Sequence, residues 1–284
     1  MNILVTGANG FIGLHLCNYL KTQKAITIYK IGKKNINNET NFFESDLSKK
    51  NSVNIICDNL KNKKIDVIFH LASKLVGGNQ DIDEKIKVFD ENIKITKNII
   101  EITKFLKPKK IINVSSIAVY PNIDGNFKED SQIDMSNNSE CFYGLSKFCS
   151  EIFFNSILSK LDVNVLNLRI AQVYGAGMRN DRIFSIMQEE LKKNNSITVY
   201  GNGERLSNFI NIDKLIIFFN IFIKTNYRGT FNVGDQNISY LKLALLIKKQ
   251  FGNKSTKIIK INKGIKSKFK LNCSKLNKLN NFKI

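Results

Sequence analysis

The chain has 284 residues, of which 43% are hydrophobic, so it can bury a full core as one large domain or as two intertwined lobes. It opens on a strand-like stretch rather than a basic and apolar leader, and no apolar run approaches the ~20 residues that span a bilayer, so we expect a cytoplasmic protein with no membrane partner. Its 44 basic and 24 acidic residues give a formal charge of +20, but the lysines are scattered along the whole chain, which indicates a compositional bias rather than a nucleic-acid-binding surface.

The first motif is a glycine-rich turn. A short apolar strand over residues 2–6 runs into Gly7-Ala-Asn-Gly10-Phe-Ile-Gly13, and an apolar helix follows to about Leu20. In this strand–helix context Gly7 permits a tight turn, Gly10 lets the backbone approach a pyrophosphate, and Gly13 lets helix and strand pack closely. The helix N-terminus would bind the phosphates through its free N–H groups. We therefore predict a dinucleotide-binding turn, whose other contributors are Asn9, Phe11 and Ile12.

The second strand, expected over residues 26–31, ends in Gly32-Lys33-Lys34. Chains that bind NAD commonly place a carboxylate here for the ribose 2′-hydroxyl, but the next acidic residue in this chain is Glu39. Lys33 and Lys34 can instead accept a 2′-phosphate, so the sequence favours NADP(H), with NAD(H) still possible. Asp46 follows a third strand, where its carboxylate can hydrogen-bond the adenine amine.

A fourth parallel strand is predicted over residues 65–71, and it leads into Leu71-Ala72-Ser73, a strand end of mostly small residues along which a cofactor can lie. Residues 74–81, with Gly77-Gly78, are interpreted as a flexible loop over the cofactor. A long helix is expected over residues 82–106, and we include its Asn92 among the cofactor-binding residues. A fifth strand is expected over residues 110–115.

Side chains suited to proton transfer follow the fifth strand. Ser115 and Ser116 lie at its C-terminal end, where ligands bind in open α/β sheets. Tyr143 and Lys147 are four residues apart in a helical pattern that runs to about residue 160, so the phenol and the ammonium would point the same way. The ordinary phenol pKa of ~10 is too high for a base at neutral pH, and a nearby lysine cation lowers it. The pair therefore suits alcohol/ketone chemistry, with a serine hydroxyl holding the substrate oxygen.

These motifs together resemble the extended short-chain dehydrogenase/reductase family, and most of all its nucleotide-sugar epimerases, dehydratases and reductases. The resemblance covers nearly the whole chain, including Leu168-Arg-Ile-Ala-Gln-Val-Tyr-Gly175 and the Gly-x-Gly loop that precedes Asp213. It implies an α/β fold with a Rossmann-type doubly wound parallel sheet in residues 1–168. Residues 169–284 would form mainly a smaller C-terminal α/β substrate-binding lobe, partly intertwined with the first domain. It also implies a homodimer.

The resemblance assigns roles to individual residues. Tyr143 would be the acid/base, and Lys147 would bind the nicotinamide ribose and lower the pKa of the tyrosine. Ser116 would take the position of the family's catalytic hydroxyl, with Ser115 a close alternative. Asp46 and Leu47 would flank the adenine. The substrate-binding residues would be Gln172, Arg179, Arg182 and Arg205.

The chain also departs from the family pattern in its substrate half. The family arginine that often grips a diphosphate aligns with Ser207, and Arg205 lies two residues earlier. The family asparagine before Val-Tyr-Gly is Gln172 here. These changes concern the substrate headgroup rather than the cofactor fold.

Three reactions share this machinery. A 4,6-dehydratase would need an Asp-Glu pair after the catalytic hydroxyl, where this chain has Ile117 and Ala118. A reductase would take a 4-keto(-6-deoxy) sugar nucleotide to an alcohol with diffusible NADPH, in carbohydrate biosynthesis, and Lys33-Lys34 favours this reaction. A 4-epimerase with retained NAD is the alternative, and a non-catalytic nucleotide- or RNA-binding Rossmann protein is the more distant one.

No metal is expected. The five cysteines form no Cys-x-x-Cys pair, and the two histidines, His15 and His70, lie far apart in the sequence. This pattern favours neither a zinc site nor a disulfide framework, and it suits reduced thiols in the cytoplasm. A small-molecule nucleotide sugar is the expected partner.

Overall fold

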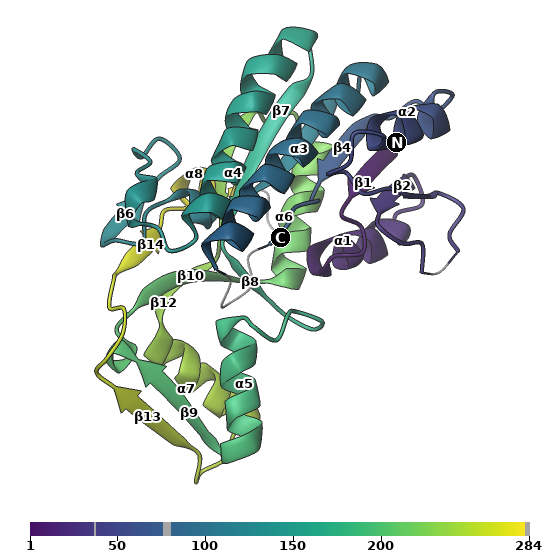
Figure 1. Ribbon diagram of the computed structural model, residues 1–284. Helices are drawn as coiled ribbons and strands as arrows, with labels where there is room; N and C mark the ends of the chain where they lie inside the picture. Colours follow the sequence, from purple (N-terminus) through teal and green to yellow (C-terminus); the bar gives the residue numbers. More distant parts are fainter. Residues whose placement is uncertain (37, 76–80, 282–284) are drawn as a thin grey trace.

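The computed structural model describes residues 1–36, 38–75 and 81–281 (Figure 1). Most of the loop predicted over residues 74–81, including Gly77 and Gly78, lies outside the described residues. No helix in the described part of the chain is both long and apolar enough to cross a bilayer.

Within these residues, seven parallel strands form the large sheet, in the order β11-β7-β5-β4-β1-β2-β3. Their bounds are β1 Asn2–Thr6, β2 Thr27–Gly32, β3 Phe42–Glu44, β4 Val67–His70, β5 Lys110–Ser116, β7 Asn164–Ile170 and β11 Gly229–Val233. The chain order reverses between β1 and β4, which is where doubly wound sheets bind ligands. The predicted Rossmann-type α/β fold is confirmed.

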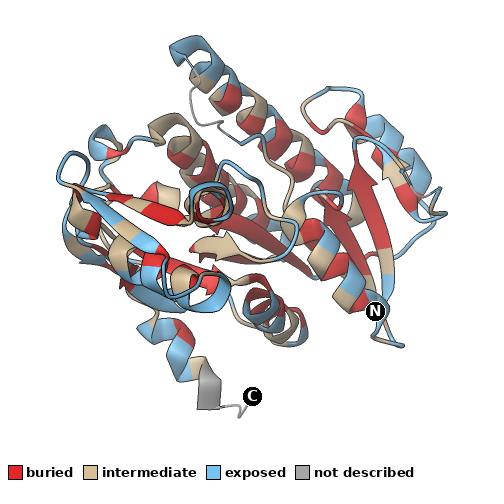
Figure 2. Ribbon diagram, turned by 90° about the horizontal axis from the view of Figure 1, so that it is seen from below, coloured by how far each residue is buried: buried red, intermediate tan, exposed pale blue. Residues whose placement is uncertain are grey.

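Helices cover both faces of this sheet because its strands are apolar on both sides. In β1, Ile3 packs in one core with α1 and α6, while the adjacent Leu4 packs in a second core with α2 and α3. Helix α4 lies beside α3 (Figure 1). Figure 2 shows the buried strands between helices whose outer faces are exposed. The bounds of these helices are α1 Phe11–Lys21, α2 Ser52–Leu60, α3 Ile82–Leu106, α4 Cys141–Phe153 and α6 Ile212–Lys224.

The remaining elements form three smaller sheets and a third core. The sheets are β12-β10-β8, β13-β9 and β14-β6, and α5 and α7 pack against β9 in the lower part of Figure 1. The strands are β6 Gly125–Phe127, β8 Gln172–Tyr174, β9 Ser196–Tyr200, β10 Leu206–Asn211, β12 Gln236–Ser239, β13 Lys257–Ile261 and β14 Phe269–Leu271. The helices are α5 Ile183–Asn194, α7 Tyr240–Phe251 and the short α8 Ser274–Asn277.

The division of the chain at residue 168 stays a prediction. Two elements that follow this position, α6 and β11, pack with the large sheet rather than with α5 and α7. The two halves of the sequence therefore share the sheet that positions the site.

Candidate active site

A cavity of about 900 Å³ opens at the carboxyl ends of the strands of the large sheet, with β8, α5 and the segment before β10 on its other side. This volume is in the range of ligand-binding sites. The predicted cofactor-binding residues that line it are Gly7, Asn9, Gly10, Phe11, Ile12, Gly13, Lys33, Lys34, Asp46, Leu47, Leu71, Ala72, Ser73 and Lys147. The other predicted site residues that line it are Ser115, Ser116, Tyr143, Gln172, Arg179, Arg182 and Arg205.

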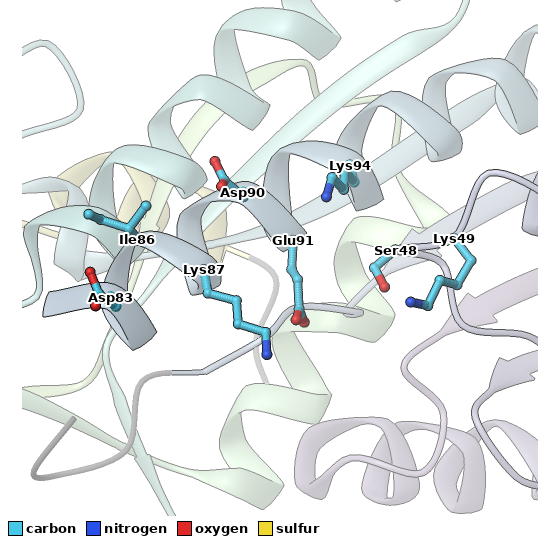
Figure 3. A pocket seen from close by; sticks show the side chains of 8 residues that line it. All are labelled: Ser48, Lys49, Asp83, Ile86, Lys87, Asp90, Glu91 and Lys94. Carbon is cyan, nitrogen blue, oxygen red and sulfur yellow. The ribbon is translucent and has the colours of Figure 1, made fainter. Parts of the chain in front are cut away.

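A second hollow of about 440 Å³ lies on α3 beside the loop before α2 (Figure 3). Lysines and carboxylates line most of it; in Figure 3, Lys87 and Glu91 extend from α3 and Lys49 from the facing loop. It contains none of the residues predicted for the site. The large cavity is therefore the candidate active site.

The glycine turn is shaped as its spacing predicts. Gly7 has a φ of +68°, which other residues rarely adopt, and a Cβ on Gly13 would lie 2.3 Å from the Gly7 carbonyl oxygen. Gly10 precedes α1, and no side chain caps the helix there. The N–H groups of the first turn are thus available at the cavity wall to an anion such as a pyrophosphate.

Lysines surround the end of β2. Lys33 Nζ lies 2.8 Å from the Asp46 carboxylate, and its side chain is 69% exposed. Burial acts to raise the pKa of the Asp46 carboxyl, but hydrogen bonds from Lys33 and Ser48 outweigh it and lower the pKa to about 2. Glu39 pairs with Lys30 at 2.5 Å and does not line the cavity. Among the described residues, Asp46 is thus the carboxylate at this end of the site.

Asn92 has a different position from the one predicted. It is buried and is not among the residues that line the cavity. Its side-chain oxygen accepts hydrogen bonds from the Lys74 N–H at 2.7 Å and the Ser73 hydroxyl at 3.1 Å, and its amide donates to Ser146 Oγ at 3.0 Å. Asn92 therefore fixes the segment that lines the cavity, and a direct contact with a cofactor is not supported.

Tyr143 and Lys147 lie in the first turns of α4, against the turn that follows Ser116. A Cβ on Gly144 would lie 2.0 Å from the Ala118 carbonyl oxygen, so only glycine allows this close approach. Lys147 Nζ is 5.9 Å from the centre of the Tyr143 ring and donates to the Val114 carbonyl oxygen at 2.9 Å. The phenol and the ammonium therefore share one side of the helix.

The pKa of Tyr143 shifts in the direction opposite to the prediction. Burial raises the pKa of its phenol to about 12, and Glu140 acts in the same direction. Arg182 and polar interactions with the Ser116 and Ser73 hydroxyls lower it by less. The predicted lowering was wrong for this structure because the desolvation of the phenolate outweighs the effect of Arg182. Tyr143 therefore carries its proton at neutral pH.

Burial also lowers the pKa of Lys147 to about 8, and the Glu151 carboxylate acts against this shift. Since an unfolded lysine titrates near ~10.4, the unfolded chain binds more protons than the folded chain between pH ~8 and ~10.4, and the contribution of this group to stability rises with pH there.

We expect Lys147→Met to stabilise the protein at pH 7, with the gain in stability shrinking as the pH rises through that window. Urea unfolding of the wild-type protein and of the Lys147→Met variant from pH 7 to 10 measures this difference in stability. Exposed Lys87→Met is the control, and a gain that does not change with pH would contradict the burial of a charged amine.

The two candidate serines point to different surroundings. Ser116 Oγ accepts from the Ala118 N–H at 3.1 Å at the cavity wall. Ser115 is 1% exposed, and its hydroxyl donates to Glu151 at 2.5 Å. The geometry favours Ser116 as the hydroxyl beside Tyr143.

Sequence reasoning missed a buried ion pair behind the site. Glu151 and Arg169 have side chains that are 3% and 4% exposed, and two guanidinium nitrogens bind the carboxylate, the shortest contact being 2.8 Å. Arg169 also donates to the Tyr120 hydroxyl at 2.8 Å. The available signal was the spacing, because Glu151 lies one helical turn beyond Lys147.

The four residues predicted to bind substrate line the side of the cavity formed by β8, α5 and the segment before β10. Gln172 donates to Ser207 Oγ at 2.7 Å, which links β8 to β10. The Arg205 guanidinium lies 5.1 Å from the centre of the Tyr240 ring. Arg179 pairs with Asp181, and Arg182 lies 3.7 Å from Glu140. These residues supply both cations and neutral hydrogen-bonding groups.

Known proteins match most of the chain. The model of a family described as "NAD dependent epimerase/dehydratase family" matches residues 3–234. A dTDP-D-glucose 4,6-dehydratase from Dictyostelium discoideum is 31% identical over 268 residues, which are 85% of this chain and 60% of that protein. A dTDP-4-dehydro-6-deoxy-D-allose reductase from a Streptomyces species is 22% identical over 267 residues, covering 86% of this chain and 79% of the relative.

Solved structures give the same fold. One of them is the UDP-glucuronic acid 4-epimerase from Bacillus cereus in complex with UDP-glucuronic acid and NAD, with a TM-score of 0.80 at 26% identity. The match covers 98% of this chain and 92% of the epimerase chain. A dTDP-glucose 4,6-dehydratase from Bacillus anthracis in complex with NAD has a TM-score of 0.79 at 19% identity. That match covers 98% of this chain and 89% of the dehydratase chain. At that identity the second likeness shows the fold alone.

Proposed function

The chain belongs to the NAD-dependent epimerase/dehydratase family of nucleotide-sugar enzymes, and from this premise we propose that it reduces a 4-keto, or 4-keto-6-deoxy, sugar nucleotide with NADPH. The observation that carries this proposal is the end of β2, where Lys33 and Lys34 line the cavity and Asp46 is already engaged by Lys33. This arrangement suits a ribose 2′-phosphate better than a free 2′-hydroxyl.

The residues around Tyr143 support reduction. A bound nicotinamide supplies the hydride. The Tyr143 phenol, whose pKa of about 12 keeps it protonated, then donates its proton to the substrate oxygen. Ser116 holds that oxygen with its hydroxyl, and Lys147 binds the nicotinamide ribose. Lys33 and Lys34 bind the 2′-phosphate, Asp46 and Leu47 flank the adenine, and the first turn of α1 binds the pyrophosphate.

The wall beside Ser116 argues against elimination. Ile117 and Ala118 line the cavity directly after Ser116 and carry no group that could move a proton. A 4,6-dehydratase needs an acid and a base that act at carbons 5 and 6 of the sugar.

A 4-epimerase with retained NAD is the second candidate. It is supported by the Bacillus cereus 4-epimerase structure, which contains NAD and is 26% identical to this chain. Denaturing the purified protein and identifying the released nucleotide separates the two proposals. Tightly retained NAD(H) would favour the epimerase, and a protein free of nucleotide that prefers NADPH would favour the reductase. A homodimer and a cytoplasmic location stay predictions.

The cofactor preference has its own test. Lys33→Asp/Lys34→Ala should weaken NADPH binding by about tenfold or more and NADH binding far less, because only the 2′-phosphate loses its cations. Fluorescence titration of both dinucleotides measures the two affinities. Lys61→Asp/Lys63→Ala, at exposed lysines that do not line the cavity, is the control. Equal losses for NADPH and NADH would contradict the 2′-phosphate assignment.

A further inference from the structure

Ser45 lines the cavity, and its hydroxyl has no hydrogen-bond partner in the described part of the chain. Four buried side-chain oxygens among the described residues have no partner, and Ser45 Oγ is the one whose residue lines the cavity. The whole residue is 8% exposed. A buried hydroxyl that has given up water without gaining a protein partner is unfavourable, so this position calls for a partner from outside the chain.

The backbone of Ser45 is fixed beside the end of β2. The residue follows β3 directly, and its N–H donates to the Gly32 carbonyl oxygen at 2.9 Å. The hydroxyl, by contrast, moves between rotamers by rotation about the single Cα–Cβ bond. A ligand in the cavity can therefore gain this hydroxyl without any movement of the backbone.

The cavity wall around Ser45 is apolar. Ile31 lies in β2, one residue before the carbonyl that holds Ser45, Leu47 lies two residues after Ser45, and Ile95 comes from α3. All three side chains are buried, line the cavity and pack in the same hydrophobic core. Ser45 thus adds a single free hydroxyl to a wall made by elements on one side of the large sheet.

The charged groups at this end of the cavity lie nearer to solvent. Lys33 and Lys34 are exposed, and the Asp46 side chain, which is 30% exposed, accepts hydrogen bonds from Lys33 and Ser48. A phosphate suits the exposed lysines, because it keeps part of its hydration there. An adenine ring has apolar faces and hydrogen-bonding nitrogens at its edge, so it suits the apolar wall with its one free hydroxyl.

We propose that Ser45 binds the adenine of the dinucleotide, with its hydroxyl hydrogen-bonded to the edge of the ring. The inference rests on the proposed placement of the adenine beside Asp46 and Leu47, and it holds for NADPH and NADH alike, because both contain this base. An ionised Asp46 can accept from the adenine amine but cannot donate. The ring nitrogens accept, and the Ser45 hydroxyl supplies a donor for one of them.

Ser45→Ala separates a ligand-binding hydroxyl from a structural one. In protein freed of nucleotide the substitution removes no hydrogen bond, so urea unfolding should show no loss of stability. The affinities for NADPH and NADH should both fall by about two- to tenfold, the usual effect of one hydrogen bond. In competition titrations AMP should lose affinity by the same factor, and nicotinamide mononucleotide, which lacks the adenine, should lose none.

Ser52→Ala is the matched control. Ser52 is also buried, but it does not line the cavity, and its hydroxyl accepts from the Asn98 amide at 3.3 Å. This variant should lose stability and keep its affinities for both dinucleotides. If it weakens dinucleotide binding as much as Ser45→Ala does, the inference is overturned, because any change in packing near α2 would then suffice.

The other outcomes separate this inference from the proposed function. Unchanged affinities in Ser45→Ala overturn the inference, and so does a loss confined to NADPH, which would place the hydroxyl at the 2′-phosphate. A loss of stability in the nucleotide-free protein as large as that of Ser52→Ala also overturns it, because the hydroxyl would then serve the fold. Equal losses for both dinucleotides, in a protein that prefers NADH, support the adenine contact and overturn the proposed NADPH preference alone.

Discussion

Tyr143→Phe should lower the rate of 4-keto sugar nucleotide reduction by about 10²–10⁴-fold, the usual contribution of a positioned acid. The substitution removes the hydroxyl that donates the proton and keeps the ring that packs near Lys147, 5.9 Å away. The affinity for NADPH should hardly change, because the glycine turn, Lys33 and Lys34 are untouched. Steady-state kinetics together with a dinucleotide titration test both halves of this expectation.

A second tyrosine provides a matched control. Tyr174 also lines the cavity, where its ring stacks on Phe184 with a centroid distance of 4.9 Å. Tyr174→Phe keeps that stacking, so it should retain turnover within a few-fold. If Tyr143→Phe stays near wild-type activity, or loses NADPH binding as steeply as turnover, the proton-donor role of Tyr143 is wrong.

The elements that were predicted well have local causes. Helix α3 has the predicted bounds, residues 82–106, because Asp81 caps its start and Lys107 takes a left-handed conformation before Pro108. Strand β6, Gly125–Phe127, by contrast, is not among the strands predicted from the sequence. It exists because Gly125 pairs in register with Phe269, 144 positions away in the chain, and a local pattern does not contain that contact.

The same distinction applies to the site. The glycine turn and the Tyr143–Lys147 spacing could be found from the sequence, because each depends on neighbours in the chain. The direction of the Tyr143 pKa could not, because it is set mainly by burial, and burial depends on packing between segments that lie far apart in the chain. The contacts of Asn92 could not be predicted for a related reason: an amide on a helix face can point at a cofactor or at the backbone of Lys74, and only packing decides between them.

Glu151→Ala should destabilise the protein by about 3–5 kcal/mol, the usual penalty for breaking a buried ion pair. The change would leave the Arg169 guanidinium, whose side chain is 4% exposed, without its carboxylate, and the Ser115 hydroxyl without its acceptor. It would also remove the negative charge that keeps the pKa of Lys147 from falling further. Urea unfolding gives the stability, and the turnover of the folded fraction gives the effect on Lys147.

A double-variant cycle distinguishes a broken pair from a lost contact. Glu151→Leu/Arg169→Met replaces both charges with apolar groups of similar size, and it should recover much of the stability that either single change loses, because no unpaired charge remains. The recovered protein should still turn over slowly, since Lys147 lacks its carboxylate in both cases. If each single change costs less than about 1 kcal/mol, as at an exposed pair, then α4 is not fixed by this contact. If stability and turnover both return in the double variant, Glu151 acts on the fold and not on the charge of Lys147.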